Sequence, residues 1–127
     1  MSAWTEDELR RINAAQEVEI APVRRNGELR RPTPIWVVEA GNEVYVRGAY
    51  GANKGWHGVA RTSRHARLGV GGVEQDVTVE DADPAVFDEV DAAYREKYGR
   101  RYASIVQSIT DAEHRATTLR LAARSAE

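Results

Sequence analysis

The sequence contains no cysteine, and its 127 residues include one methionine and one phenylalanine. The absence of cysteine excludes a disulfide framework, a thiolate nucleophile and a cysteine metal site. The three histidines, His57, His65 and His114, are scattered among basic residues, which makes a histidine metal site a poor expectation. We therefore expect no bound metal ion.

Long apolar runs are absent as well. No stretch reaches the roughly 20 apolar residues that a helix needs to cross a bilayer, and the first residues lack the basic-then-apolar pattern of a signal peptide. We therefore expect a cytoplasmic protein that makes no membrane contact. The 127 residues are predicted to form one domain, residues 1–127, which is long enough to bury a stable core without disulfide or metal cross-links.

Charge is unevenly distributed along a chain whose formal net charge is only -2. Residues 24–67 carry nine basic and three acidic side chains, whereas residues 74–96 carry nine acidic side chains and one basic one, Arg95. Two interpretations are open: ordinary mixed surface charge, or an anion site in the basic middle. The overall acidity argues against a surface that follows nucleic acid phosphates, so we expect no nucleic acid partner.

The most hydrophobic run, residues 35–38, precedes a polar turn at Gly41 and Asn42 and a second β-rich run at residues 44–46. β-Branched and aromatic residues suit strands, so both runs are predicted to pair as a central antiparallel hairpin. An unbroken apolar run is typical of a strand buried on both faces, which makes Trp36 a predicted core residue.

This hairpin has a predicted register. The turn pairs positions whose numbers sum to about 83, which would place Pro34 and Ile35 opposite Gly48 and Ala49. The start of one strand then faces the end of the next. We therefore expect Arg31 and Arg47 to emerge at the same end of the barrel, under the loop of residues 51–55.

Capping signals predict the helices. Thr5 and Glu8 form a capping box, and Asp83 followed by Pro84 begins a later helix with Phe87 on its inward face. The predicted helices cover residues 5–15, one or two turns near 56–60, residues 84–98 and a short stretch around residue 105.

Alternating apolar residues predict the other strands. Asn26 and Gly27 are a strong hairpin signal of the type I′ kind, which needs positive φ at both positions. Strands are expected at residues 18–22, 66–70, 73–79 and 116–121, besides the central pair. About six antiparallel strands joined by short turns would close into a small barrel, which makes the fold α+β and mainly β.

No nucleophile–base motif is visible in the sequence. Asp88 and Asp91 share one helix face, where a solvated surface is a simpler interpretation than an acid–base pair. His57 beside Trp56 is expected to be a surface histidine, with proton donation as the alternative.

The basic and aromatic residues near the hairpin are more informative. Arg31, Arg47 and Lys54 suit phosphate or carboxylate binding, and Tyr50 and Trp56 could stack on a planar ring. The alternative, that Trp56 is core and the basic residues are a solvated rim, stays open at this point.

Several short motifs are similar to those of one known superfamily. Arg31-Pro-Thr-Pro-Ile35 resembles Arg-Thr-Thr-Pro-Leu, Tyr50-Gly51 resembles Tyr-Gly-Gly, and Lys54-Gly-Trp56 resembles Pro-x-Trp. Residues 67–72 then fall on the next strand and turn. Residues 18–121 therefore resemble an uncharacterised bacterial family of the flavin-binding split β-barrel superfamily. Deazaflavin-dependent nitroreductases are the similar members, and pyridoxamine phosphate oxidases are more distant.

The resemblance implies a split antiparallel β-barrel with an N-terminal helix and one or two late helices. It implies an oxidoreductase that holds deazaflavin coenzyme or flavin mononucleotide (FMN), with Arg31, Lys54 and Trp56 near the cofactor. Arg47 and Tyr50 join this site on physical grounds. The relatives' Gly-Arg-x-Ser-Gly loop is Arg24-Arg25-Asn26-Gly27-Glu28 here, and their Asn-Leu after tryptophan is Gly58-Val59.

Two alternatives use the same barrel cleft. One is a binding module for another anionic or aromatic small molecule, and the other is a cofactor-free isomerase or cyclase. The resemblance also implies a homodimer paired through the barrel wall. Val73, Val77 and Val79 form an apolar strand face that a small barrel would leave uncovered, which agrees with a dimer.

Overall fold

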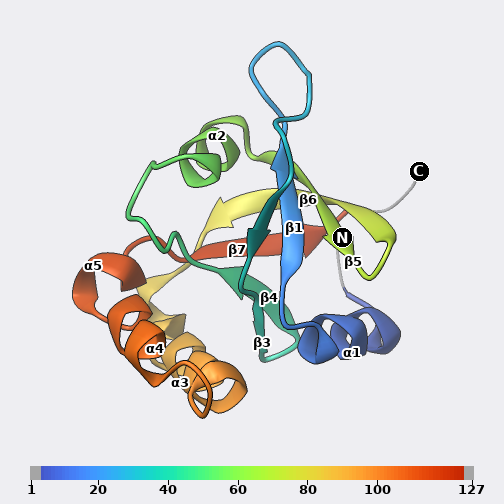
Figure 1. Cartoon of the computed structure of the whole chain (residues 1–127). Helices are drawn as coiled ribbons and strands as arrows, with labels where there is room; N and C mark the ends of the chain where they lie inside the picture. Colours follow the sequence, from blue (N-terminus) through green and yellow to red (C-terminus); the bar gives the residue numbers. More distant parts are fainter. Residues whose placement is uncertain (1–3, 125–127) are drawn as a thin grey trace.

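The computed structural model describes residues 4–124, which form one antiparallel sheet flanked by helices (Figure 1). The first half of this part contains α1 (Glu6–Ala14), β1 (Val18–Pro22), β2 (Thr33–Ile35), β3 (Val38–Ala40), β4 (Glu43–Val46) and α2 (Trp56–Ser63). The second half contains β5 (His65–Val70), β6 (Val73–Asp81), the 3-10 helix η1 (Pro84–Val86), α3 (Phe87–Tyr98), α4 (Ala103–Ile109), α5 (Ala112–Arg115) and β7 (Leu119–Ala123).

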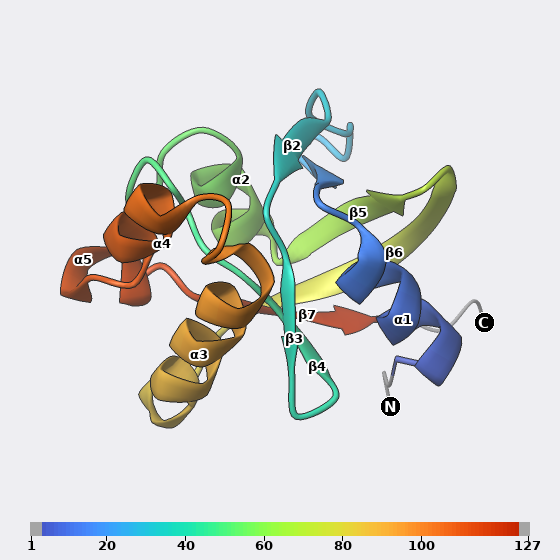
Figure 2. The ribbon, with the colours of Figure 1, turned by 60° about the horizontal axis from the view of Figure 1, so that its bottom comes forward.

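The sheet is a strongly curled half-barrel rather than a closed barrel of six strands. Its seven described strands lie in the order β2-β1-β5-β6-β7-β4-β3. β2 and β3 are therefore the two outer strands, although only Trp36 and Val37 separate them in the chain. A two-residue link can join opposite edges only if the sheet curls until the edges approach each other. Figure 2 shows the chain running from β2 directly into β3.

The apolar run at residues 35–38 was predicted to be one strand, and this is wrong. Ile35 ends β2 and pairs with Val18 of β1, whereas Val38 begins β3 and pairs with Tyr45 of β4. Pro34 lies opposite Glu19, so Pro34 and Ile35 do not face Gly48 and Ala49. The break is stable because the backbone N–H of Val37 donates to the hydroxyl of Tyr98 (3.2 Å), which replaces a strand partner.

The register of the β3–β4 hairpin is confirmed. Ala40 pairs with Glu43 and Val38 pairs with Tyr45, as the turn predicts. Gly41 and Asn42 have φ of 58° and 67°, the positive values of a type I′ turn. The hairpin at Gly27 exists too, but of its two turn residues only Gly27 has positive φ, so the predicted type I′ geometry is wrong there.

The core has two parts. The concave side of the half-barrel is filled by aliphatic side chains and closed by α1, which starts at the predicted capping box of Thr5 and Glu8. The second part lies where α3 packs Val90, Tyr94 and Tyr98 against the β3–β4 hairpin. Val77 and Val79 lie in the first part, so most of the valine face expected to be uncovered is buried within the chain.

Two predicted core residues are only half-buried. The Trp36 ring lies at the surface of the second core and stacks on Tyr98, with ring centroids 3.9 Å apart. Phe87 lies in the first turn of α3, before the helix meets the sheet, and the guanidinium of Arg115 covers its ring. Periodicity predicted the buried stripe of α3 correctly from residue 90 onward, but it does not show where contact with the sheet begins.

The last part of the chain contains more helix than expected. The predicted short helix around residue 105 is α4, and α5 follows it before β7. The final strand is therefore displaced toward the C-terminus, from the predicted residues 116–121 to residues 119–123, and its Leu119 and Leu121 are buried. None of the helices within residues 4–124 has the length and apolar character of a membrane span.

Candidate functional site

A cleft of about 540 Å³ opens between β2, the β4–α2 loop and α4. This volume lies within the roughly 300–1,000 Å³ that small-molecule sites occupy. Aromatic and aliphatic side chains form most of the wall, and three basic side chains and one acidic side chain provide charge. The lining residues are Glu17, Arg30, Thr33, Pro34, Ile35, Trp36, Arg47, Ala49, Tyr50, Lys54, Gly55, Trp56, Ile105 and Ile109.

Glycine gives the β4–α2 loop its shape. Gly51 and Gly55 have φ of 106° and 54°, a region that other residues seldom adopt. A Cβ added at Gly55 would lie 3.7 Å from Nη2 of Arg30, an ordinary van der Waals distance, so it is the positive φ that favours glycine at this position. α2 then begins at Trp56, which the helix directs inward.

Four of the five predicted site residues line this cleft: Arg47, Tyr50, Lys54 and Trp56. Trp56 is 7% exposed and also belongs to the core, so the two interpretations of this residue are compatible. Tyr50 is 89% exposed and lies at the mouth. The structure therefore brings together most of the basic and aromatic residues that the sequence singled out.

Arg31 does not line the cleft. It borders a separate hollow with Glu19 and Arg67, and the adjacent Arg30 lines both that hollow and the cleft. Arg30 donates from Nη1 to Oγ1 of Thr33 (3.0 Å). Neighbouring residues of an extended chain point to opposite sides. The sequence alone does not reveal whether Arg30 or Arg31 faces the cleft. Pro32 lies between these arginines and β2, so the alternation of side chains along β2 cannot be extended back to them.

Arg47 is buried and fully paired with protein groups. Its side chain has no exposed surface, and Nη1 lies 2.6 Å from Oδ1 of Asp91. Nε donates to Oγ1 of Thr118 (2.9 Å), and Nη1 also donates to the carbonyl of Ile109 (3.0 Å). Arg47 thus joins β4 to α3, α4 and β7 beneath the cleft, and its charge is already compensated.

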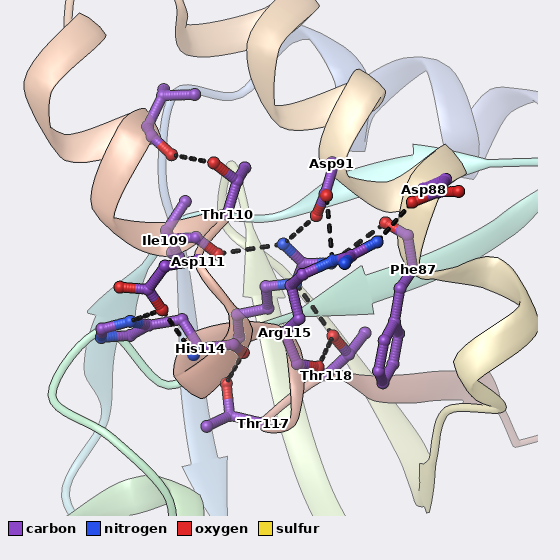
Figure 3. Close-up of polar contacts among 12 residues, drawn as sticks. Phe87, Asp88, Asp91, Ile109, Thr110, Asp111, His114, Arg115, Thr117 and Thr118 are labelled. Atoms are coloured by element: carbon purple, nitrogen blue, oxygen red, sulfur yellow. Dashed lines mark hydrogen bonds and ion pairs between the residues drawn. The ribbon is translucent and has the colours of Figure 1, made fainter.

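Asp91 was expected on a solvated helix face, and this is wrong. Asp91 is 5% exposed because Arg47 and Arg115 both contact its carboxylate, the latter through Nε at 3.0 Å from Oδ2. Asp88, one turn earlier, is the exposed member of the pair and also contacts Arg115. Figure 3 shows Asp91, Arg115 and Thr118 converging from α3, α5 and the segment just before β7.

The basic residues near the mouth of the cleft are less paired with protein groups than Arg47 is. Arg30 and Lys54 take part in no ion pair within residues 4–124. Both side chains line the cleft together with Glu17, its one acidic residue. An anionic group bound between Arg30 and Lys54 would supply the missing counter-charge.

His57 was expected at the surface, and it is instead 1% exposed. Its Nδ1 accepts from the backbone N–H of Asn53 (2.9 Å), and Nε2 lies 2.9 Å from the carbonyl oxygen of Thr117. Burial lowers the pKa of His57 below its usual value. The ring belongs to the structure behind the cleft and does not line it.

Comparison with known proteins assigns the family. The model of DUF2255, described as an uncharacterized protein conserved in bacteria, matches residues 8–121. The chain belongs to this family. The resemblance to an uncharacterised bacterial family is therefore confirmed at that level, while the link to flavin-binding proteins stays a prediction.

One solved structure similar to this member of DUF2255 is the conserved hypothetical protein Rv2991 from Mycobacterium tuberculosis. The TM-score is 0.61 at 13% sequence identity, and the alignment covers 99% of this chain and 83% of that one. At this identity the similarity shows a shared fold and nothing about ligands. The search of curated proteins found no significant match.

Proposed function

We propose that the cleft binds FMN or the deazaflavin coenzyme and that the protein is an oxidoreductase acting on a small organic substrate. The observation that carries the proposal is that one cleft combines Arg30 and Lys54, two cations that form no ion pair within residues 4–124, with the aromatic wall of Trp36 and Trp56. A planar ring with an anionic tail matches both features of the cleft.

Each group has a role in this proposal. Lys54 and Arg30 hold the phosphate. Trp36, Trp56 and Tyr50 contact the ring system. Arg47 supports the floor of the cleft from behind. The flavin supplies hydride transfer when bound, while the chain supplies binding, orientation and exclusion of water.

Calorimetric titration with FMN and with the deazaflavin coenzyme tests the proposal. A charge-assisted contact is worth roughly 1.5–3 kcal/mol, so Arg30→Ala and Lys54→Ala should each weaken binding by about tenfold or more. Arg31→Ala is the matched control, because it removes the same charge one residue away and outside the cleft, and its affinity should equal that of the parent. If the parent binds neither cofactor, the redox proposal fails.

A non-redox binding module, or a cofactor-free isomerase or cyclase, is the second candidate. The cleft lining favours a binding role because, in the described part of the chain, it contains no histidine and only Glu17 as a carboxylate. A purified protein without visible absorption, which binds planar carboxylates or phosphates but neither flavin, would support the binding module. Turnover of such a ligand without added cofactor would indicate the isomerase or cyclase.

A further inference from the structure

The loop at residues 48–55, called the cleft loop here, carries Tyr50 and Lys54 into the cleft. Its backbone is irregular, with positive φ at Gly51 (106°), Asn53 (61°) and Gly55 (54°). No strand ladder includes it, so its shape depends on individual contacts. The position of the Lys54 ammonium therefore depends on whatever fixes the backbone of this loop.

His57 makes the central contact. Its buried ring accepts a hydrogen bond from the N–H of Asn53 within the loop and lies 2.9 Å from the carbonyl oxygen of Thr117, just before β7. The N–H of Gly48 donates to Oγ1 of the same Thr117 (2.9 Å). The ring, which belongs to α2, thus connects the cleft loop to Thr117 in the segment just before β7.

Gly48 packs directly against this ring. A Cβ at Gly48 would lie 3.1 Å from Cδ2 of His57 and 3.0 Å from the carbonyl oxygen of Gly51. Any larger residue would push against the ring or the loop. The absence of a side chain at Gly48 is an independent sign that the ring and the loop occupy one closely packed arrangement.

The two partners of the ring require one protonation state. The Asn53 N–H needs a lone pair on Nδ1, and the Thr117 carbonyl needs a proton on Nε2. The neutral ring with its proton on Nε2 meets both needs. A doubly protonated ring would instead direct an N–H at the Asn53 N–H, so that hydrogen bond would be lost.

The charged groups around the ring have opposing effects. Burial lowers the pKa of His57 most strongly, and the hydrogen bond to the Thr117 carbonyl raises it. Arg61 of α2 lowers the pKa, and Asp81 of β6 raises it. Arg61 and Asp81 pair with each other at 3.1 Å, which reduces the net effect of both. His114 of α5 also faces the cleft loop, with Nε2 3.1 Å from the carbonyl oxygen of Ala49.

We propose that His57 is a positioning residue whose neutral form holds the cleft loop in its ligand-binding shape, and that protonation in acid releases the loop and weakens ligand binding. The effect on ligand rests on the function proposed above. The effect on the loop is a property of the ligand-free protein and can be measured without any ligand.

The first experiment uses the ligand-free parent. Nitrogen-15 NMR of the histidine rings near about pH 7.5 should show His57 as the neutral form protonated on Nε2. Hydrogen exchange should show an Asn53 amide that is protected at this pH and loses its protection, after correction for the intrinsic rate, at the acidic pH at which the same ring signals show His57 taking up a proton. A ring protonated on Nδ1, or an Asn53 amide that exchanges freely at both pH values, would overturn the proposal.

Variants separate this role from a general structural one. His57→Gln cannot titrate and should leave Asn53 exchange fast at every pH. His65→Gln, on β5 and outside the loop, should reproduce the parent. Equal Asn53 protection in His57→Gln and the parent would count against the proposal.

Riboflavin is the ligand probe, because it has no phosphate whose own titration would confuse the result. Its affinity for the parent should fall about fivefold or more between about pH 7.5 and the acidic pH at which the ring signals show His57 protonated, the effect of one lost hydrogen bond. In His57→Gln the affinity should be weak at both. A parent affinity that does not change with pH would overturn the link to binding. If FMN, riboflavin and the deazaflavin coenzyme all fail to bind at any pH, the proposed function fails, and the NMR and exchange results alone decide the role of His57.

Discussion

Asp91 shows how one buried carboxylate can hold several elements together. It pairs with Arg47, whose side chain has no exposed surface, and with Arg115. Asp91→Ala would leave the Arg47 charge buried without its partner, so we expect a loss of about 3–5 kcal/mol in the free energy of unfolding. Asp88→Ala, one turn earlier with a side chain 94% exposed, should cost less than about 1 kcal/mol. Urea unfolding at neutral pH measures both, and equal losses would contradict a buried pair.

His57 should make stability depend on pH. Burial lowers its pKa in the folded protein below the usual 6.5, at which the unfolded chain takes up a proton. Stability is therefore fully present above about pH 6.5 and falls as the pH drops below it, with a slope of at most about 1.4 kcal/mol per pH unit, until the folded form is protonated too. Urea unfolding at several pH values should show this fall in the parent and a smaller one in His57→Gln. Parallel profiles for the two proteins would show that other groups cause the effect.

Among the elements, the two-residue link between β2 and β3 is unusual because it joins the two outer strands of the sheet. Val37 is fully buried there and lies in neither strand, so α3 satisfies its backbone: Tyr98 accepts from its N–H, and Nζ of Lys97 donates to its carbonyl (2.8 Å). The Tyr98 hydroxyl also donates to the carbonyl of Gln16 (2.8 Å). Helix α3 thereby lets the chain leave one edge of the half-barrel and enter the other.

Tyr98→Phe tests this arrangement. It removes one oxygen and leaves the buried N–H of Val37 unpaired, so we expect a loss of about 1–3 kcal/mol in the free energy of unfolding. Tyr102→Phe is the control, because among the described residues its hydroxyl bonds only the exposed side chain of Gln16, and its loss should cost less than about 0.5 kcal/mol. Denaturation curves that place the two variants together would mean that Val37 finds another partner.

For the whole molecule we expect a homodimer. The large apolar side chains most exposed within residues 4–124 include Tyr50 (89%) and Ile105 (49%), which border the same cleft. Light scattering at micromolar concentration should give twice the chain mass of 14.1 kDa, and Tyr50→Glu with Ile105→Glu should give the single chain. Val73→Glu, at the distant β5–β6 turn, is the control and should leave the dimer intact. A monomeric parent would overturn this expectation.

The sequence by itself determined the features that depend on neighbours in the chain. The capping box of Thr5 and Glu8, the register around Gly41 and Asn42 and the buried stripe of α3 involve residues a few positions apart. Such contacts form within one element, so propensity, capping and periodicity are sufficient to predict them. The same is true of the basic and aromatic loop that contributes Tyr50, Lys54 and Trp56 to the cleft.

Only the tertiary structure decided which polar groups are buried and which arginine faces the cleft. The sequence around Asp91 is typical of a surface helix, and its burial depends on Arg47, 44 positions away. The sequence around His57 likewise indicates a surface residue, and its ring contacts the carbonyl of Thr117, 60 positions away. Arg30 and Arg31 have the same side chain, and only the pairing of β2 with β1 decides that Arg30 lines the cleft. Burial of a charge or a hydrogen-bonding group depends on partners that distant segments supply, and no local pattern identifies those partners.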